Sequence, residues 1–417
     1  MNVRLAYGTG MIDVLLPPGV TADVIESKET DPLSDPSSAI AAALANPIES
    51  APLGELAAGK KTAVFSVPDA TRPIPLPAIL PALLEAITPS IPKEKVLVLF
   101  ATGMHRPVTE EEARCLLGET LASELRWESH DPARTRNLGV TDRGAAIDVD
   151  ERFLDADLRI AVGLVEPHLL AGFSGGRKLV GPGLVSMETM RVLHGPGIVG
   201  HEKARAGVLD GNPMHSEALA IARASGLHFT VNVTIGKGRR LSGVFAGEPD
   251  LSHRAACEAV TRTGRTDRGG RDLVITSGGG APLDATFYQS VKGIVGAEAL
   301  VKPGGAILLC ASCDEGWGSE SFLSLLTEAP DLDSFLAWAS KEGNFRRDQW
   351  MVQHLREAMR GKRIYVYSEH LHRSTASILG LTPVDSPAAG IDAAIHGSAN
   401  PSVAVIPNGP YTWVRVE

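Results

Sequence analysis

The segment from Glu166 to Lys178, with the sequence EPHLLAGFSGGRK, has the densest set of residues able to do chemistry. It contains one imidazole, three glycines and two cations: His168, Gly172, Gly175, Gly176, Arg177 and Lys178. Glycines let backbone amides approach an anion closely, and the two cations add positive charge. The spacing differs from that of a P-loop, because Leu179 follows Lys178 where a P-loop has Ser or Thr. We interpret the segment as an anion-binding loop, in preference to a surface turn with incidental charge.

A second group of polar residues lies in the sequence DATRPIP at positions 69–75. Asp69 and Thr71 are typical helix caps, and a helix that begins near Pro73 would explain both of them. Arg72 is harder to explain in this way, because a guanidinium offers two parallel hydrogen bonds to a carboxylate or a phosphate. We therefore keep Arg72 as a predicted anion-binding residue.

A third group surrounds His105, in the sequence GMHRPVTEEE at positions 103–112. Thr109 and Glu112 have the spacing of a capping box, so we expect them to begin a helix. His105 lies in the loop before that helix, where an imidazole can face a cleft and act as a base or a metal ligand.

Three further features lie later in the chain. His194 is followed by Gly and Pro, and the segment YQSVK at 288–292 contains Gln289 and Lys292, which share one face of a helix. Such an amide and ammonium can hold a small anion, although the spacing alone favours a solvated surface. Cys310 and Cys313 form a lone CxxC without the second ligand pair of a zinc site, so we interpret them as packing at the end of a strand.

The elements that must position these residues alternate between short β-rich runs and amphipathic helical patterns. This alternation predicts an α/β fold with largely parallel sheets, in which ligands gather beyond the carboxyl ends of strands. The expected strands are 62–67, 95–100, 158–165, 229–235, 272–277, 306–309, 363–367 and 403–406. The expected helices are 76–87, 110–121, 213–224, 251–263, 319–326 and 349–359.

At 417 residues the chain is too long for one core, so two domains are expected. The polar stretch TRTGRTDRGGR at 261–271 suits a linker. We place an N-terminal α/β domain at 1–268 and a C-terminal α/β domain at 269–389, with the active site in the cleft between them. Periodicity leaves open whether the tail 390–417 packs back on the first domain.

The overall composition excludes several classes of protein. The net charge of −9 argues against a nucleic-acid binder, and no apolar run is long enough to span a bilayer. The N-terminus lacks the pattern of a signal peptide, and four cysteines in so long a chain do not suggest a disulfide scaffold. We therefore expect a cytoplasmic protein of unknown oligomeric state.

Taken together, these segments resemble the nickel-dependent lactate racemase family. The resemblance rests on residues 69–75, 103–112, 166–178, His194 and YQSVKG at 288–293, with DQWMVQ at 348–353 similar to a further family segment. The matches run in order through most of the chain. The block EPH…GFSGGRK is the most specific of them.

The resemblance implies a cofactor and a role for each residue. The cofactor is the nickel-pincer nucleotide, nickel pyridinium-3,5-bisthiocarboxylate mononucleotide, which would be attached covalently to Lys178 with His194 as a nickel ligand. His105 and His168 would be the two acid/base residues, and the substrate would be a small 2-hydroxy acid. Proteins of cofactor biosynthesis would bind transiently. The remaining implied site residues are Arg72, Tyr288, Gln289 and Lys292 for the substrate, and Asp69, Thr71, Arg72, Gly175, Gly176, Arg177 and Trp350 for the cofactor.

The implied reaction explains why such residues are needed. A carboxylate barely stabilises a carbanion at C2, so inversion by proton removal is difficult. Removal of a hydride leaves a planar 2-keto acid instead, and requires a base on the hydroxyl and an acceptor facing the C–H bond. An imidazole, with a pKa of roughly 6.5, suits the base, and sulfur donors with an imidazole suit square-planar nickel.

One departure from the family affects the choice of substrate. The lactate enzymes of the family have two Phe residues directly after EPH, whereas this chain has Leu169 and Leu170. Malate and sugar acids such as gluconate are therefore alternatives to lactate. Two other functions are a nicotinamide-dependent 2-hydroxy acid dehydrogenase, for which the chain has no well-placed GxGxxG, and a catalytically silent scaffold that carries the cofactor.

Overall fold

The computed structural model describes residues 1–72, 74–341 and 343–416, and divides into two compact units. Unit 1 comprises Met1–Lys28, His194–Gly200 and Gly264–Glu417, and unit 2 comprises Glu29–Leu193 and His201–Thr263. Both are α/β units with largely parallel sheets, which confirms the predicted fold class. Among the described residues, no helix has the length and apolar character needed to cross a membrane.

The sheet of unit 2 has six strands in the order β13-β12-β9-β4-β5-β6. All neighbouring pairs are parallel except β12 with β13, which is antiparallel. Because β9, β4 and β5 are parallel neighbours, their carboxyl ends meet at one edge of the sheet. The strands are β4 (Ala63–Val67), β5 (Val96–Phe100), β6 (Arg126–Ser129), β9 (Leu158–Leu164), β12 (Phe229–Ile235) and β13 (Leu241–Gly247).

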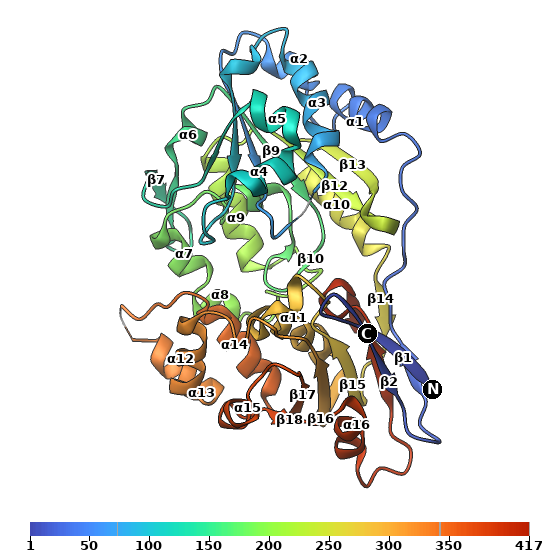
Figure 1. Cartoon of the computed structure of the whole chain (residues 1–417). Helices are drawn as coiled ribbons and strands as arrows, with labels where there is room; N and C mark the ends of the chain where they lie inside the picture. Colours follow the sequence, from blue (N-terminus) through green and yellow to red (C-terminus); the bar gives the residue numbers. More distant parts are fainter. Residues whose placement is uncertain (73, 342, 417) are drawn as a thin grey trace. The chain divides into compact units, whose positions relative to one another are not determined.

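Helices cover both faces of this sheet (Figure 1). One face packs against α1, α3, α4 and α5, whose Leu, Ile and Ala side chains join those of the strands in one buried core. The helices of unit 2 are α1 (Pro36–Ala45), α2 (Leu53–Ala57), α3 (Leu76–Ile87), α4 (Glu110–Leu117), α5 (Glu119–Glu124), α6 (Glu151–Leu154), α7 (Met187–Leu193), α9 (Pro213–Ala224) and α10 (Leu251–Thr261). A hairpin of β7 (Thr135–Val140) and β8 (Ala146–Asp150) completes the unit, apart from the loop of β10 and β11 described below.

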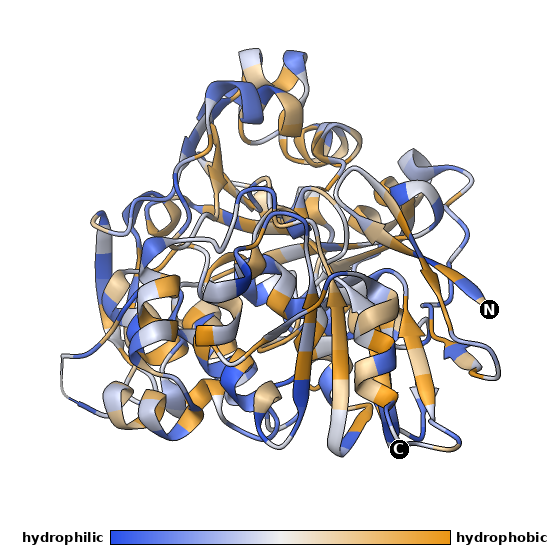
Figure 2. Cartoon of the chain, turned by 60° about the horizontal axis from the view of Figure 1, so that its bottom comes forward, coloured by the Kyte–Doolittle hydropathy of each residue, from blue (hydrophilic) through white to orange (hydrophobic). Residues whose placement is uncertain are grey.

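The sheet of unit 1 is parallel throughout, with the strand order β18-β17-β16-β15-β19-β3. Its central strands β15 and β16 contain the buried apolar runs 273–275 and 306–309, as expected of strands covered on both faces. Figure 2 shows several strands of the chain in orange along much of their length. The strands are β3 (Ala22–Val24), β15 (Arg271–Ser277), β16 (Val301–Cys310), β17 (Arg363–Tyr367), β18 (Thr382–Pro383) and β19 (Val403–Ile406). The helices are α8 (Pro196–Val199), α11 (Phe287–Glu298), α12 (Glu320–Glu328), α13 (Leu332–Ala339), α14 (Gln349–Met359), α15 (Arg373–Ile378) and α16 (Pro387–Ile395).

The structure differs from the predicted domain boundaries at both ends of the chain. The tail belongs to unit 1, where β19 pairs with β15 inside the sheet and β20 (Val414–Val416) pairs with β14 (Arg265–Asp267). The first 28 residues also belong to unit 1. They form the hairpin of β1 (Asn2–Tyr7) and β2 (Gly10–Leu15), whose alternate residues join the core of this unit, and then the edge strand β3.

Most predicted elements match the structure closely. The helix expected at 110–121 is divided into α4 and α5 at Gly118, whose φ of +78° ends the first helix. Helix α3 begins at Leu76 with Pro75 as its cap, so Asp69 and Thr71 do not cap it, and Pro73 lies outside the described residues. The capping box of Thr109 and Glu112 is confirmed.

Candidate functional site

Three loops of unit 2 begin at the shared edge formed by β4, β5 and β9, and they carry the residues predicted from the sequence. Asp69 follows β4, His105 follows β5, and the segment 166–178 follows β9. The parallel order β9-β4-β5 thus explains why residues that lie almost a hundred positions apart in sequence belong to one edge.

Asp69 and His105 form a hydrogen-bonded pair. His105 Nδ1 lies 2.6 Å from Asp69 Oδ2, while Asp69 Oδ1 accepts hydrogen bonds from the Thr71 backbone N–H at 3.0 Å and the Thr71 hydroxyl at 2.6 Å. Burial opposes ionisation of Asp69, but the contacts with His105 and Thr71 outweigh it and hold the pKa of Asp69 below its usual value. The His105 side chain is 53% exposed against 9% for Asp69. A buried carboxylate therefore orients an accessible imidazole, as in a general-base pair.

Arg72 also lies at this edge. Its guanidinium is 3.7 Å from the Glu166 carboxylate, and both side chains are partly exposed. At this distance the pair is loose, so Arg72 retains donors for an anion.

The segment 166–178 turns back on itself as a short hairpin. Strand β10 (Pro167–His168) pairs with β11 (Gly172–Phe173), and a 3₁₀ turn follows at Gly176–Leu179. The ring nitrogen His168 Nδ1 accepts hydrogen bonds from the backbone N–H groups of Leu170 at 3.2 Å and Ala171 at 3.1 Å. In the run from Ala171 to Val180 every residue is buried except Lys178. This loop therefore brings only its lysine toward the surface.

Arg177 corrects one sequence prediction. Its side chain is 1% exposed and points into the unit, where it donates to the carbonyl oxygens of Ala171 and Phe173 and lies 2.8 Å from His253 Nε2. Arg177 therefore stabilises the loop from inside instead of adding charge to an anion site. Burial lowers its pKa to about 10.

The glycines of the loop also act differently from the sequence prediction. The Gly176 N–H is not available to an anion, because it donates to Asn232 Oδ1 at 2.9 Å. A methyl group on Gly172 would lie 2.1 Å from the Val208 carbonyl oxygen, and one on Gly176 would lie 2.8 Å from the His253 ring. Both glycines have positive φ. They are needed for close packing in a tight turn.

Unit 1 carries the other predicted residues on helices and on the segment that begins at His194. The His194 and Trp350 rings lie 4.7 Å apart between centroids, tilted by 53°. The segment 194–200 is held to α14 by Gln353, whose side-chain amide donates to the Pro196 carbonyl oxygen at 3.3 Å. Gln353 is the last residue of the DQWMVQ segment, which explains one function of that motif.

Helix α11 begins directly after its cap, Thr286, and carries three of the residues predicted from the sequence: Tyr288, Gln289 and Lys292. Lys292 donates a hydrogen bond to the Gln289 side-chain oxygen, so the pair shares one face of the helix as predicted. Burial, together with the neighbouring Asp348 carboxylate, raises the pKa of Tyr288 well above its usual range. Tyr288 is thus a neutral hydroxyl near neutral pH.

Several residues that support the predicted site residues could not be identified from the sequence. Asp348 has φ +69°, is buried, and accepts a hydrogen bond from the Ser319 hydroxyl at 2.7 Å. Asp348 is the first residue of the DQWMVQ segment, and this resemblance was the one feature of the sequence that pointed to it. His253 and Asn232 support the Lys178 loop from α10 and β12 and have no sequence signal.

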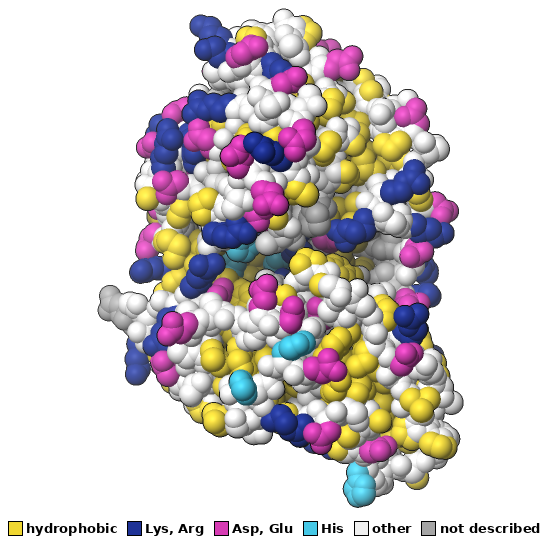
Figure 3. Space-filling model, in the orientation of Figure 1, with side chains coloured by type: hydrophobic (Ala, Val, Ile, Leu, Met, Phe, Trp, Pro, Cys, Tyr) yellow, Lys and Arg dark blue, Asp and Glu magenta, His cyan; other side chains and the backbone are white. Residues whose placement is uncertain are grey.

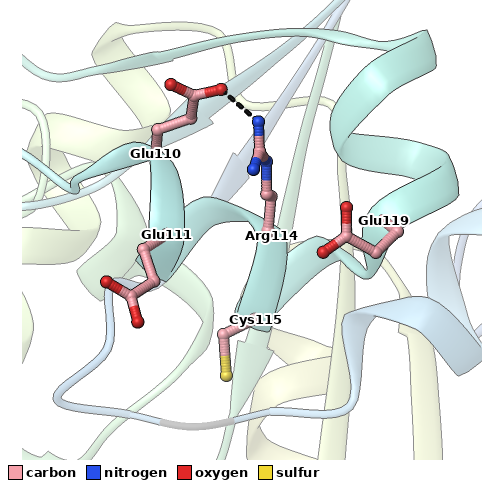
Figure 4. Close-up of a pocket in the computed structure, with 5 residues that line it drawn as sticks. All are labelled: Glu110, Glu111, Arg114, Cys115 and Glu119. Carbon is pink, nitrogen blue, oxygen red and sulfur yellow. Dashed lines mark hydrogen bonds and ion pairs between the residues drawn. The ribbon is translucent and has the colours of Figure 1, made fainter.

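Other features of the surface and interior do not indicate a function. Burial raises the pKa of both Cys310 and Cys313 to about 12, so neither thiol is poised to react. A depression of about 530 Å³ beside α4 is lined by none of the predicted site residues (Figure 4). Its lining residues are Glu110, Glu111, Arg114, Cys115 and Glu119. On the visible faces of both units, cationic and anionic side chains are interspersed (Figure 3).

Comparisons with known proteins cover almost the whole chain. A family model described as the lactate racemase N-terminal domain matches residues 7–207, and one described as the lactate racemase C-terminal domain matches residues 267–414. A lactate racemase of Thermoanaerobacterium thermosaccharolyticum is 32% identical over 422 residues, which is 99% of each chain. One of Lactiplantibacillus plantarum is 36% identical over 315 residues, which is 74% of each chain.

Solved structures give the same result. The lactate racemase apoprotein of Thermoanaerobacterium thermosaccharolyticum matches with a TM-score of 0.93 and 31% identity, and the match covers 100% of both chains. A Thermotoga maritima protein matches with a TM-score of 0.68 and 19% identity over 93% of this chain, which shows a shared fold alone.

Proposed function

Because the chain belongs to the lactate racemase family, we propose that it inverts C2 of a small 2-hydroxy acid, with lactate as the first substrate to test. The observation that carries the proposal is the edge of the unit 2 sheet formed by β9, β4 and β5. This edge supplies an imidazole oriented by a carboxylate, a second imidazole, a guanidinium and a lysine, each on a loop that directly follows a strand. The family assignment favours inversion over the dehydrogenase alternative.

We propose that the reaction uses the nickel-pincer nucleotide. When bound, this group would supply an acceptor for the hydrogen on C2 together with its bonding electrons. One observation fits such a group. In the buried run from Ala171 to Val180, Lys178 is the one residue that is partly exposed, and its amine is the group proposed to form the covalent bond.

The residues around the cofactor divide into two sets. We propose His194 as the nickel ligand, with Trp350, whose ring lies 4.7 Å from that of His194, limiting the rotation of the imidazole. We propose that Thr71 and Arg72 hold the nucleotide end, since both lie at the open edge of the unit 2 sheet. Asp69, which the sequence assigned to the nucleotide, is instead proposed to orient His105.

Binding of the substrate carboxylate is assigned to cations and amides. Arg72, Gln289 and Lys292 are the proposed partners, because a guanidinium, an amide and an ammonium all donate hydrogen bonds to a carboxylate. The neutral hydroxyl of Tyr288 is proposed to lie beside them. His105 and His168 are proposed as the two acid/base residues, on opposite sides of the substrate, so that one serves each enantiomer.

Leu169 bears on the choice between lactate and larger acids. Leu170 is buried and its carbonyl oxygen accepts a hydrogen bond from Asn212, whereas Leu169 is partly exposed. We therefore propose Leu169 as the pocket-lining member of the pair. Replacement of Phe by the smaller Leu would leave room for malate or a sugar acid.

The experiment uses protein made in a host able to synthesise the cofactor. We expect intact mass to show an adduct on Lys178, nickel to co-purify, and chiral chromatography to show conversion of each lactate enantiomer into the other. Malate and gluconate are assayed in parallel. Lys178→Ala should lose the adduct and the turnover, whereas the matched exposed-lysine variant Lys61→Ala should keep both.

Two results would contradict the proposal. One is a fully active protein without nickel and with unmodified Lys178. The other is accumulation of a free 2-keto acid together with a reduced dinucleotide, which would indicate a dehydrogenase. An adduct on Lys178 without turnover of any 2-hydroxy acid would instead support a carrier of the cofactor.

A further inference from the structure

A buried histidine that the proposed reaction does not use lies at the same edge of the unit 2 sheet. His130 directly follows β6, the strand next to β5, and its backbone N–H donates to the Phe100 carbonyl oxygen at 3.0 Å. Its side chain is fully buried. A buried imidazole is costly unless its nitrogens are hydrogen-bonded, so the partners of this ring indicate what it does.

Both ring nitrogens of His130 face oxygen atoms that accept hydrogen bonds. Nδ1 lies 2.8 Å from Asp150 Oδ2, and Nε2 lies 3.0 Å from the Val185 carbonyl oxygen. A neutral imidazole carries one proton and can make only one of these two bonds, whereas an imidazolium makes both. The geometry therefore fits a doubly protonated His130.

Ionised groups around His130 compensate such a charge. Burial opposes ionisation of Asp150, but hydrogen bonds from His130 and Arg152 outweigh it and lower the pKa of Asp150 to about 2. Arg152 donates to Asp150 through Nε at 2.9 Å and Nη2 at 2.7 Å, and it also contacts the partly exposed Glu128. Glu128 is paired on its solvent side with two exposed arginines, Arg126 and Arg134.

The bond to Val185 anchors residues 180–186, which lie between the proposed cofactor lysine and α7. Two backbone hydrogen bonds join this segment to β8, at Leu184 and at Ser186, with lengths of 2.9 and 3.2 Å. Val185 lies between them, and its carbonyl oxygen accepts from His130 instead. His130 thus supplies an attachment that the strand pairing does not.

Residues 180–186 also contact two of the loops that carry proposed site residues. The Gly183 N–H donates to the Lys178 carbonyl oxygen at 3.1 Å, and the Gly183 carbonyl oxygen accepts at 3.0 Å from Gly103, in the loop of His105. A methyl group on Gly183 would lie 2.9 Å from the Lys178 carbonyl oxygen, so the packing at this point is close. A shift of the segment would therefore move both loops.

We infer that His130 is a positioning residue for the site: as an imidazolium it ties residues 180–186 to β6 and β8, and so fixes the backbone of Lys178 and of the His105 loop. The inference rests on the proposed function for the roles of Lys178 and His105. It adds a buried residue that the resemblance to the family did not include.

The first test uses the apoprotein and needs no turnover. In long-range ¹H–¹⁵N spectra of protein labelled with ¹⁵N-histidine at pH 7, His130 should show protons on both ring nitrogens, and His130→Gln assigns its signals. His228 is the reference for a neutral ring in the same unit, because its Nδ1 accepts from the Arg159 N–H at 3.2 Å and burial lowers its pKa to about 4. A His130 ring with a proton on one nitrogen alone would overturn the inference.

The second test separates the two hydrogen bonds with two amide variants. A glutamine amide places an N–H near the position of His Nε2 and keeps the bond to Val185, whereas the shorter asparagine amide reaches the position of Nδ1 and keeps only the bond to Asp150. Hydrogen exchange of the apoprotein in a peptide covering 180–186 should accelerate about tenfold in His130→Asn, where a buried carbonyl loses its donor, and by less than about threefold in His130→Gln.

Both variants remove the same charge, so a residue that only neutralised the buried carboxylate would give equal acceleration in the two. That result would overturn the inference. If either variant failed to fold, the spectrum of the parent would still decide it.

The same pair is then compared in protein made with the cofactor. The fraction of Lys178 that carries the adduct, measured by intact mass, should fall several-fold in His130→Asn and stay near that of the parent in His130→Gln. His228→Asn is the matched control, because its amide oxygen can still accept from the Arg159 N–H, and it should leave the fraction unchanged.

These measurements distinguish the inference from the proposed function. If the parent carries no adduct and inverts no 2-hydroxy acid, the proposed function fails, while the spectra and the exchange rates of the apoprotein still decide the state of His130 and its hold on residues 180–186. If the parent is active and the two His130 variants behave alike, the inference alone fails.

Discussion

In unit 2 the groups able to do chemistry lie on loops that follow strands, whereas in unit 1 they lie on helices and on the segment 194–200. A loop lacks the regular backbone hydrogen bonds of a helix or a strand, so other groups must hold its shape. In unit 2 buried polar side chains do this: Asp69 holds His105, and the Lys178 loop is held by Arg177, Asn232 and His253. A helix needs less support. Gln289 and Lys292 are aligned by helical spacing, and Gln353 secures the segment 194–200 with one hydrogen bond.

We therefore expect activity to depend on the buried residues that lie behind the proposed reacting groups of unit 2. Substitution of such a residue in unit 2 should therefore affect catalysis strongly. The equivalent substitution in unit 1 should affect mainly stability, or very little.

The largest effect is expected for Asp69→Asn. An asparagine amide can donate to His105 Nδ1 and thereby favour the tautomer that lacks a lone pair on Nε2, so kcat should fall by about 10⁴-fold, as in other carboxylate-oriented histidines. The matched variant in unit 1 is Asp348→Asn, where the amide oxygen can still accept from Ser319, and its loss should stay below about tenfold. Steady-state kinetics on both variants with folded, loaded protein measures this ratio. Similar losses in the two variants would remove the distinction between the units.

The next effect concerns two buried arginines that donate to carbonyl oxygens. Arg177 in unit 2 and Arg356 in unit 1 are 1% and 2% exposed, and Arg356 donates to the carbonyl oxygens of Leu326, Ala329 and Leu379. Each substitution by Met leaves several buried carbonyls without a donor and should cost about 3–5 kcal/mol of unfolding free energy.

Only one of these variants should affect the proposed cofactor site. We expect Arg177→Met to lower the fraction of Lys178 that carries the adduct, because the loop loses its internal support, and Arg356→Met to leave that fraction unchanged in folded protein. Urea titration gives the stability and intact mass gives the fraction. Full modification of Lys178 in Arg177→Met would show that the loop holds its shape without this residue.

The sequence predicted the strands and the loops that follow them better than the side-chain packing that supports those loops. The hydrophobic period and the positions of the strand ends are local signals in the sequence. They were enough to predict the parallel sheets, most of the elements, and the placement of Asp69, His105 and the Lys178 loop after strands. The direction of the Arg177 side chain could not be predicted, since a buried arginine and an exposed one look alike in sequence. His253 and Asn232 had no signal, because their contacts with the loop join residues 56 or more positions apart.

The domain boundaries show the same limitation. The linker at 261–271 was visible as a change in composition, and the division between the units falls at residues 263 and 264. The return of β3 and β19 to the sheet of unit 1 was not visible, because strand order depends on long-range pairing that apolar runs do not specify.

A smaller effect is expected for the two leucines after His168. Leu170→Phe adds volume inside a packed region of unit 2 and should cost about 1–3 kcal/mol of stability. Leu169→Phe lies at a partly exposed position, so it should leave stability unchanged and move the ratio of kcat/KM values toward lactate and away from larger acids. Thermal unfolding and parallel assays on lactate, malate and gluconate measure both. A change of preference in Leu170→Phe alone would assign the pocket to the other leucine.

The smallest expected effect is a loss of stability at acidic pH. In unit 2, burial lowers the pKa of His215 to about 3, that of His228 to about 4, and that of His253 well below its usual value. In unit 1, burial lowers the pKa of His354 to about 4. Below about pH 6.5 the unfolded chain binds a proton on each of these histidines, whereas the folded chain does not until its own lower pKa is reached. Stability therefore falls as the pH decreases from about 6.5, by roughly 1 kcal/mol per histidine at pH 6.

Among the residues the structure describes, three of these histidines with a lowered pKa lie in unit 2 and one lies in unit 1, so unit 2 should open first on acidification. Hydrogen exchange followed by mass spectrometry between pH 7 and 5, corrected for the intrinsic rate, should show faster opening of β9 and β12 than of β15 and β16. His215 is the best site for the control, because neither of its ring nitrogens has a hydrogen-bond partner within 3.5 Å, and His215→Leu should reduce the difference between the units. If β15 and β16 opened first, the greater sensitivity of unit 2 would not come from its buried histidines.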